Sequence, residues 1–220
     1  DLKYSIGQAV ALAGDLPARP GEPLQADGST DITALLDELA ARKRDADQQT
    51  RLLNRQQDME HIVALLDRAP RVFVHGLGDD GVYARELTIR LSLLGMLAIH
   101  QSDPILMLSN LSAVRDGDVL LMLSEFGKMP ALIHISRQFQ DLGGSVVSVT
   151  RHTANPLRAM SDASLVVCAH DQAPHMAQLL YRSALQSLLD CLFVLLCHAN
   201  PDRLRLLGNN LERVQHLIDT

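Results

Sequence analysis

Short, almost continuous apolar segments alternate with longer amphipathic segments between residues 71 and 168. Residues 72–74 and 119–122 are apolar throughout, whereas the segments between the apolar runs repeat apolar residues every three or four positions. Continuous apolar strands are typical of parallel sheets that helices cover on both faces. The pattern therefore predicts an α/β fold, a doubly wound five-stranded parallel sheet flanked by helices, with strands at 71–75, 96–99, 118–123, 146–149 and 165–168.

The amphipathic segments predict the helices around this sheet. Ser29, Thr30 and Asp31 are candidate N-caps of the first helix. Its apolar stripe ends at Leu39, and we expect its polar continuation through Arg51 to face solvent. The predicted helices lie at 31–51, 59–69, 83–94, 130–142, 174–198 and 201–218.

The first 30 residues differ in composition from the rest of the chain. Residues 1–12 carry a short helical pattern that is too small to fold alone. Residues 15–30 contain three prolines and two glycines, which is typical of a linker. We expect residues 1–28 to be the tail of a missing N-terminal domain with its linker, and residues 29–220 to form one domain.

The charge of the chain argues against direct binding of nucleic acid. The formal net charge is −6 and the isoelectric point is about 5.8. The basic run at 42–44 is followed at once by Asp45 and Asp47, so its positive charge is offset along the same helix. Aromatic residues make up 3% of the chain and Trp is absent, which disfavours stacking platforms for single strands. We expect this chain to bind no DNA by itself.

The cysteines and the longest apolar run indicate a cytoplasmic protein without membrane contact. Cys168, Cys191 and Cys197 lie in apolar runs, which predicts buried, reduced thiols. The longest uninterrupted apolar stretch, 191–197, is shorter than the ~20 residues that span a bilayer, and no signal-peptide pattern opens the chain. His75, His100 and Asp79 lie near strand ends together with Cys168, but they lack zinc-type spacing, so we expect neither a metal nor a cofactor.

Glycine-rich and polar segments follow the predicted strands, where ligands of doubly wound sheets bind. Gly76, Gly78 and Gly81 follow the first strand and can present backbone N–H groups to an anion. Their spacing departs from the dinucleotide-binding pattern, since the third glycine comes one residue early. Residues 124–129 follow the third strand, and Asn155-Pro156-Leu157 precedes the fifth.

In this order, the segments 76–81, 124–129 and 155–157 resemble the three characteristic loops of the sugar isomerase (SIS) domain. The resemblance covers residues 31–198. Among SIS proteins the chain is most similar to the RpiR-type bacterial transcription regulators, which carry a helix-turn-helix domain, a linker, paired helices and then the SIS core. Residues 1–6 resemble the last helix of that DNA-binding domain.

The resemblance implies an effector-binding SIS domain that senses a small carbohydrate-related metabolite and controls a DNA-binding domain missing from this chain. It also implies a homodimer or homotetramer, because helices at both ends of such domains form subunit contacts. DNA would then be reached only through the missing domain. The ligand-binding residues that the resemblance implies are Gly76, Gly78, Asp79, Asp80, Ser124, Gly127 and Lys128.

The loops depart from the family in the residues that hold phosphate. SIS domains bind phosphate oxygens through loop hydroxyls, but Asp79 and Asp80 stand here in place of serines, and Phe126 and Met129 replace a serine and a threonine. Two carboxylates repel a phosphate dianion, so we expect a neutral or positively charged ligand. Alternatively, the aspartates only stabilise the N-terminus of the following helix.

Two other functions remain open from the sequence. One is a sugar-phosphate aldose–ketose isomerase of the same superfamily, for which Glu125 or a crevice histidine would be the base. The other is a SIS domain that serves dimerisation alone. We expect no isomerase activity, because no acid–base pair can be placed in the loops.

Overall fold

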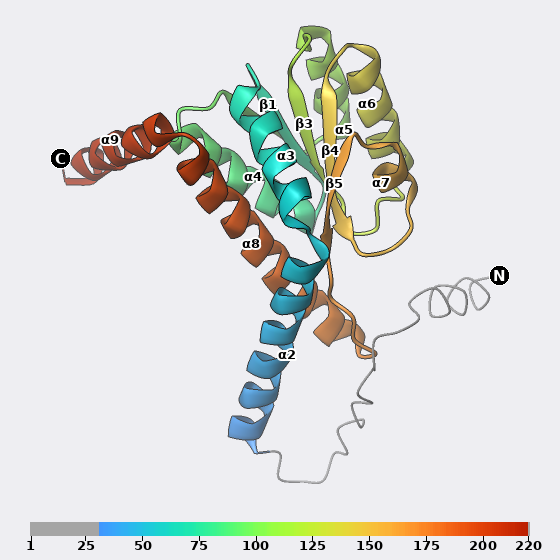
Figure 1. Cartoon of the computed structure of the whole chain (residues 1–220). Helices are drawn as coiled ribbons and strands as arrows, with labels where there is room; N and C mark the ends of the chain where they lie inside the picture. The colour runs from blue at the N-terminus through green and yellow to red at the C-terminus, as the bar shows by residue number, and fades with distance from the viewer. Residues whose placement is uncertain (1–30, 220) are drawn as a thin grey trace. The chain divides into compact units, whose positions relative to one another are not determined.

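Five parallel strands form a single sheet in the computed structural model, which describes residues 31–219 (Figure 1). Their order across the sheet is β2-β1-β3-β4-β5, and every neighbouring pair is parallel. The predicted α/β fold and five-stranded parallel sheet are thus confirmed. The strands are β1 (Val72–Gly76), β2 (Ala98–Gln101), β3 (Val119–Leu123), β4 (Ser145–Arg151) and β5 (Ala163–Val167).

Helices connect the strands and extend the chain at both ends of the sheet region. The chain divides into two compact units, Asp1–Ala41 and Arg42–Thr220, and the second holds the whole sheet. The segment 1–28, expected to be a domain tail and linker, lies outside the described residues. The helices are α2 (Ile32–Leu53), α3 (Gln56–Arg68), α4 (Asp79–Leu93), α5 (Pro104–Asn110), α6 (Pro130–Asp141), α7 (Pro156–Met160), α8 (Pro174–Ala199) and α9 (Pro201–Asp219), with a short 3-10 helix η1 (Leu111–Ala113).

Alternate residues of the strands point into two separate apolar cores, one on each face of the sheet. Val72, Val74 and Leu121 pack with α3, α4 and α8 on one face. Phe73 and Leu120 pack with α5, α6 and α7 on the other, where the rings of Phe73 and Phe139 meet edge to face. Figure 1 shows the two helical layers on either side of the sheet. Burial on both faces explains the nearly continuous apolar runs of β1 and β3.

The strand order reverses between β1 and β3, and this switch point sets the position of the candidate site. From β1 the chain passes through α4 to β2 on one side, and then crosses to β3 on the other side of β1. Loops that leave adjacent strands in opposite directions open a crevice at the carboxyl edge. The segments after β1 and β3 flank that crevice.

Two helices were not predicted from the sequence, and the bounds of all five strands differ from the prediction by one or two residues. In α5, Asp103 caps the N-terminus by accepting from the amides of Ile105 and Leu106 at 2.9 and 3.0 Å, and Pro104 follows the cap. Asn155 caps α7 in the same way. Both helices begin with a polar N-cap residue followed by proline, but they are too short to show a helical periodicity. The second strand begins at Ala98 rather than Met96, because Gly95, with a φ of 76°, redirects the chain just before it.

One side of the polar end of α2 is buried, contrary to the expectation that this whole segment faces solvent, whereas residues such as Arg51 are exposed as expected. Ile32 and Leu36 are 71% and 61% exposed, whereas Ala46 and Thr50 are buried. Thr50 Oγ1 accepts from the amide of Cys168 at 2.9 Å. Asn54, directly after the helix, donates to the carbonyl of Val166 and accepts from its amide, at 2.7 and 2.9 Å. Polar side chains here satisfy the backbone at the β5 edge of the sheet, so a hydrophobic pattern could not reveal their burial.

Helix α8 crosses the core face and is long and strongly apolar. By length and composition it is, within residues 31–219, the one helix that could cross a membrane, and 44% of its most apolar window is buried. Leu185, Leu189 and Leu192 are fully buried against the sheet layer. The three cysteines differ in environment: Cys197 is buried and Cys168 partly buried, but Cys191 is exposed, so the prediction of a buried thiol was wrong there.

Removing the amide of Asn54 is expected to destabilise the domain. Asn54→Ala leaves the buried N–H and C=O of Val166 without partners, which lowers the free energy of unfolding by about 2–4 kcal/mol. Urea denaturation followed by circular dichroism measures the change. The control Gln48→Ala, on the exposed face of α2, should shift the unfolding free energy by less than ~0.5 kcal/mol. Equal effects of the two substitutions would contradict this account of the sheet edge.

Candidate functional site

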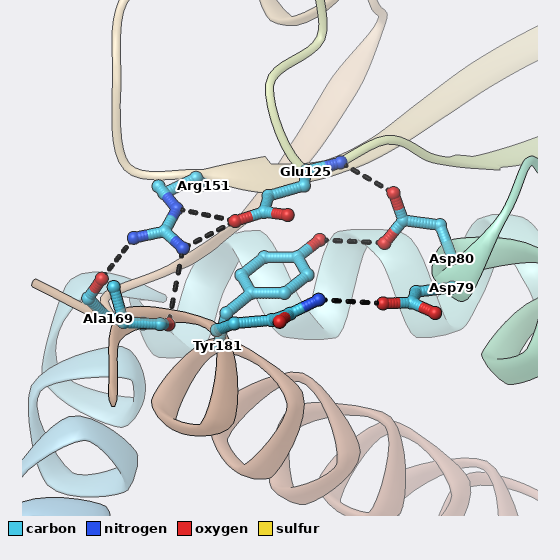
Figure 2. Close-up of polar contacts among 8 residues, drawn as sticks. Asp79, Asp80, Glu125, Arg151, Ala169 and Tyr181 are labelled. Atoms are coloured by element: carbon cyan, nitrogen blue, oxygen red, sulfur yellow. Dashed lines mark hydrogen bonds and ion pairs between the residues drawn. The ribbon is translucent and has the colours of Figure 1, made fainter. Parts of the chain in front are cut away.

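The sequence-predicted ligand residues lie at the switch point between β1 and β3. Gly76 ends β1 and Gly78 precedes α4, whose first turn holds Asp79 and Asp80. Ser124, Gly127 and Lys128 lie in the loop between β3 and α6. Figure 2 shows that Asp80 from the first loop and Glu125 from the second face one another above α8. The structure therefore brings both loops together at one edge of the sheet.

The glycines of the first loop allow α4 to begin close to β1. A side chain at Gly76 would place its Cβ 2.7 Å from the carbonyl oxygen of Asp80, so only glycine fits. Gly78 has a φ of 58°, in the left-handed region, and the space beside it is open. Gly76 therefore serves packing, whereas Gly78 lies at the open surface of the crevice.

Asp80 joins three elements through its carboxylate. One oxygen accepts from the backbone amide of Glu125 at 2.8 Å, and the other accepts from the hydroxyl of Tyr181 on α8 at 3.0 Å (Figure 2). Burial raises the pKa of Asp80, and the nearby charges of Glu125 and Asp79 raise it further, although its two hydrogen bonds oppose the shift. The carboxylate thus takes a loop amide that would otherwise be open to a ligand anion.

Asp79 points toward α8 and is more exposed. Its carboxylate pairs with Arg182 and accepts from the side-chain amide of Gln178 at 3.1 Å. The hydrogen bond from Arg182 is the main reason that the pKa of Asp79 is lowered. Neither aspartate is the N-cap residue: that position belongs to Gly78, and no side chain caps the helix there. Both carboxylates lie in the first turn of α4, where the helix dipole favours negative charge.

Arg151, at the end of β4, is a site residue that the sequence analysis missed. Its guanidinium forms an ion pair with Glu125 and donates to the carbonyl of Ala169. It also lies over two aromatic rings, with 5.8 Å to the centroid of Phe126 and 5.2 Å to that of Tyr181. Such stacking suits the planar guanidinium and fixes its orientation. Glu125 is consequently a paired, partly buried residue rather than a solvated one.

Tyr181 was also missed, because it lies within an apolar helix and has the pattern of a core residue. The side chain is 3% exposed, and burial raises the pKa of its hydroxyl well above the usual value, with Asp80 adding to the effect. The available signal for Arg151 was its place two residues after the predicted strand 146–149. No comparable signal marks Tyr181 in the sequence.

The conformation of the second loop, residues 124–129, is stabilised by contacts with the third, residues 155–157. Gly127 has a φ of 58°, and a Cβ at this position would overlap the side-chain oxygen of Asn155. Asn155 is buried, donates to Thr150 Oγ1 at 3.1 Å, and accepts from the amide of Arg158. The Asn155-Pro156-Leu157 segment therefore supports the loop that follows β3.

Ser124 and Lys128 differ in their access to the crevice. Ser124 is 8% exposed, its amide donates to the carbonyl of Val149 at 3.0 Å, and its hydroxyl makes no hydrogen bond to the described residues. It is not the cap of α6, since Met129 holds that position. Lys128 is exposed and has no ion pair within residues 31–219.

Comparisons with known proteins agree with this architecture. Residues 65–195 match the SIS domain family. Over 208 residues the chain is 26% identical to the HTH-type transcriptional regulator YfhH of Escherichia coli K12, covering 93% of this chain and 73% of that protein.

Solved structures with the same fold include regulators and isomerases. The Vibrio vulnificus NanR protein complexed with ManNAc-6P is similar with a TM-score of 0.78 and 22% identity, over 99% of this chain and 75% of NanR. The sugar isomerase domain of an RpiR transcription factor from Sphaerobacter thermophilus has a TM-score of 0.73 and 17% identity, over 81% of this chain and 98% of that one. A sugar-phosphate isomerase candidate from Listeria monocytogenes has a TM-score of 0.67 and 18% identity, over 78% and 93%.

His75 lies beneath the crevice in an apolar setting. It is 2% exposed, its Nδ1 has no hydrogen-bond partner among the residues that the structure describes, and its ring meets Phe73 at a centroid distance of 6.2 Å. Burial lowers its pKa to about 4, and His100 adds to the shift. Across residues 31–219 no group of three or more His, Cys, Asp or Glu side chains is placed to hold a metal ion.

The burial of His75 predicts a loss of stability in mild acid. The unfolded chain binds a proton near pH 6.5, whereas the folded protein does so only near pH 4. Stability therefore falls as the pH drops through this window, by about 2 kcal/mol between pH 8 and pH 5. Urea unfolding of His75→Phe should lack this contribution. The exposed control His134→Gln should keep it, and an unchanged pH dependence in His75→Phe would show that this histidine is not responsible.

Proposed function

Because this chain belongs to the SIS domain family, we propose that it is the effector-binding domain of an RpiR-type transcription regulator. It would sense a small carbohydrate-related metabolite and control an N-terminal helix-turn-helix domain. The similarity to an HTH-type regulator supports this proposal, and about a quarter of that protein lies outside the matched region. NanR, a structural relative, was solved with ManNAc-6P, which supports a sugar-derived effector.

The effector is proposed to bind at the crevice between the loops after β1 and β3. The residues proposed to line it are Gly76, Gly78, Asp79, Asp80, Ser124, Gly127 and Lys128. The observation that carries this proposal is the link from Asp80 to both Glu125 and Tyr181. A ligand that competes for either donor changes how the first loop is tied to the second loop and to α8. Binding in the crevice would thereby shift the population between subunit arrangements of a homodimer or homotetramer.

The charges in the crevice favour a neutral or cationic ligand over a phosphorylated one. Asp80 holds the amide of Glu125, so a phosphate oxygen would have to displace a carboxylate to reach it. Burial is the main reason that the pKa of Asp80 is raised, and the charges of Glu125 and Asp79 raise it further. An added phosphate would therefore meet these neighbouring carboxylates. Arg151 and Arg182 do not reverse this, because both are paired with carboxylates of the same loops.

An isomerase function is less well supported by the site. The base for moving a proton between adjacent sugar carbons would have to be Glu125 or a histidine. Glu125 is held in an ion pair with Arg151, which ties its carboxylate to the protein. His75 is buried with its pKa lowered to about 4. The fold similarity to isomerases is compatible with either function, so turnover of a sugar phosphate that Glu125→Gln abolishes would overturn the regulator proposal.

Isothermal titration with matched sugars tests the ligand class. N-acetylmannosamine and ManNAc-6P form one such pair, and amino sugars provide the cationic case. We expect the unphosphorylated sugar to bind about tenfold tighter or more, because repulsion by two carboxylates costs at least ~1 kcal/mol each. Asp79→Ser with Asp80→Ser should improve binding of the phosphate, and the unfolding temperature of the unliganded variant controls for loop damage. Micromolar binding of a sugar phosphate that this double substitution weakens would contradict the charge argument.

DNA binding tests the regulatory role. The 220-residue chain should not shift duplex DNA in a gel, because its basic residues are offset by acids. The product of the complete reading frame should bind the promoter of its own gene, and the effector found by titration should change that affinity. Salt-sensitive DNA binding by the 220-residue chain, or an effector without influence on the complete protein, would count against the proposal.

A further inference from the structure

Residues 168–173, which join β5 to α8, form a connector that contacts both the crevice and α2. These six residues adopt neither helix nor strand. Side chains of β4 and of α2 bind the connector from two directions. Segments outside the ladders of helices and sheets shift more readily than the ladders themselves. The contacts on its two sides therefore decide where the connector lies.

Arg151 holds the crevice side of the connector. Its guanidinium donates to the carbonyl of Ala169 while it is paired with Glu125, and Figure 2 shows it between these two residues. A longer hydrogen bond reaches the carbonyl of Ala177, near the start of α8, at 3.4 Å. The donors of a guanidinium are fixed in one plane, so a shift of its carboxylate partner reorients the donors that hold the connector.

Two residues of α2 hold the other side of the connector. Arg42 forms an ion pair with Asp171, whose side chain is 9% exposed, so the pair is largely withdrawn from water. Thr50 Oγ1 accepts from the amide of Cys168 at 2.9 Å and donates to its carbonyl at 3.3 Å. Arg42 and Thr50 are eight positions apart, which corresponds to about 12 Å along a helix. The connector therefore contacts α2 at two levels.

These two levels differ in what they are attached to. At the C-terminal end of α2, Asn54 also binds the carbonyl and the amide of Val166, so this end is attached to the backbone of β5. At the other level, the partner of Arg42 is Asp171, which belongs to the connector. A shift of the connector consequently moves the contact at Arg42 and leaves the contact at Asn54 in place. This arrangement permits α2 to turn about its C-terminal end.

From these contacts we infer that Arg151 is a positioning residue that couples occupancy of the crevice to the position of α2 through the connector. A hydroxyl or ammonium group that binds Glu125 competes with Arg151 for this carboxylate. The guanidinium then changes its hold on Ala169, and Asp171 changes its hold on Arg42. The connector is the element whose position both ion pairs bias, as such coupling requires.

The inference rests on the proposed function and describes how the crevice acts on the rest of the protein. Helix α2 (Ile32–Leu53) is the described helix nearest in sequence to the proposed N-terminal DNA-binding domain. A change at its Arg42 level is therefore a change on the side of the chain from which that domain would be controlled.

Hydrogen exchange of the 220-residue chain, measured by mass spectrometry without any ligand, tests the coupling. Glu125→Gln weakens the ion pair, and Arg151→Lys keeps the charge but lacks the planar fork that joins Glu125 to Ala169. We expect both substitutions to raise the exchange rates of residues 168–173 and of residues 42–46 by about threefold or more, because local opening no longer breaks these contacts. The exchange of β1 and β3 should stay unchanged.

Arg71→Lys is the matched control. Arg71 pairs with Asp118, donates to the carbonyl of Ala113 and lies 5.7 Å from the ring centroid of Phe73, and these partners belong to neither the connector nor α2. The control should not raise the exchange of the connector above that of the other segments. An equal rise with Arg71→Lys, or a rise with Arg151→Lys that spreads over the whole sheet, would mean that Arg151 only stabilises the fold, which overturns the inference.

A double-mutant cycle gives a second readout. Glu125→Gln and Asp171→Asn alter separate ion pairs, so for independent sites their effects on the unfolding equilibrium constant combine to within about twofold. We expect a deviation of about fivefold or more, as for coupled residues, and we expect it to disappear in an Arg151→Lys background. Independent effects in the unaltered background, or a deviation that persists with Arg151→Lys, overturn the inference.

Titration with N-acetylmannosamine separates failure of this inference from failure of the proposed function. Asp171→Asn should bind this sugar within about twofold of the unaltered protein, but the promoter affinity of the complete protein should no longer respond to it. A response retained in Asp171→Asn overturns the inference alone. If the unaltered protein does not bind the sugar, the proposed effector fails, while the exchange and the cycle, which use no ligand, still decide the coupling.

Discussion

A buried carboxylate must be given hydrogen-bond donors, and this requirement at Asp80 shapes the whole crevice. Its two oxygens take one donor from the loop after β3 and one from α8, so three elements distant in sequence are held in a single arrangement. The same constraint recurs around it. Glu125 is matched by Arg151, and Asp79 by Arg182 and Gln178. The carboxylates at the crevice are thus satisfied from within the protein. A ligand that contacts these carboxylates must replace hydrogen bonds that now hold the loops together. Ligand binding and the arrangement of the loops are therefore coupled.

The sheet could be predicted from the sequence because its strands are buried on both faces. Every residue from Val119 to Leu123 is buried, so the apolar run reports the strand directly. The long helices followed from their repeating stripes for the same reason. Short helices could not be found this way, since a helix such as Pro156–Met160 buries one leucine and has no periodicity to read. Polar side chains that are buried through hydrogen bonds, such as Thr50 and Asn54, give the pattern of an exposed surface.

The order of the loops predicted where the candidate site lies, but not all of the residues that form it. The predicted residues of the first two loops do lie at one edge of the sheet, as the reversal of strand order between β1 and β3 requires. Arg151 and Tyr181 were not among them. Their contribution depends on which strand lies next to which, and on how α8 crosses the face of the sheet. Neither the rotation of Tyr181 toward Asp80 nor the stacking of Arg151 between two rings has a local signature. The resemblance indicated which loop positions line the site. It could not indicate the contacts of Asp79 and Asp80, which replace the family's serines and bind side chains of α8.

The hydrogen bonds from Thr50 and Asn54 to the backbone of β5 have a consequence for how this domain meets other proteins. They occupy backbone groups of Val166 and Cys168 that an outer strand is otherwise free to extend. An extended peptide, or the same edge of another molecule, finds these positions already taken, so β-augmentation and amyloid-like growth are blocked here by two side chains rather than by a covering strand. Charged residues along β5 are therefore not needed to block edge pairing, and the strand contains none.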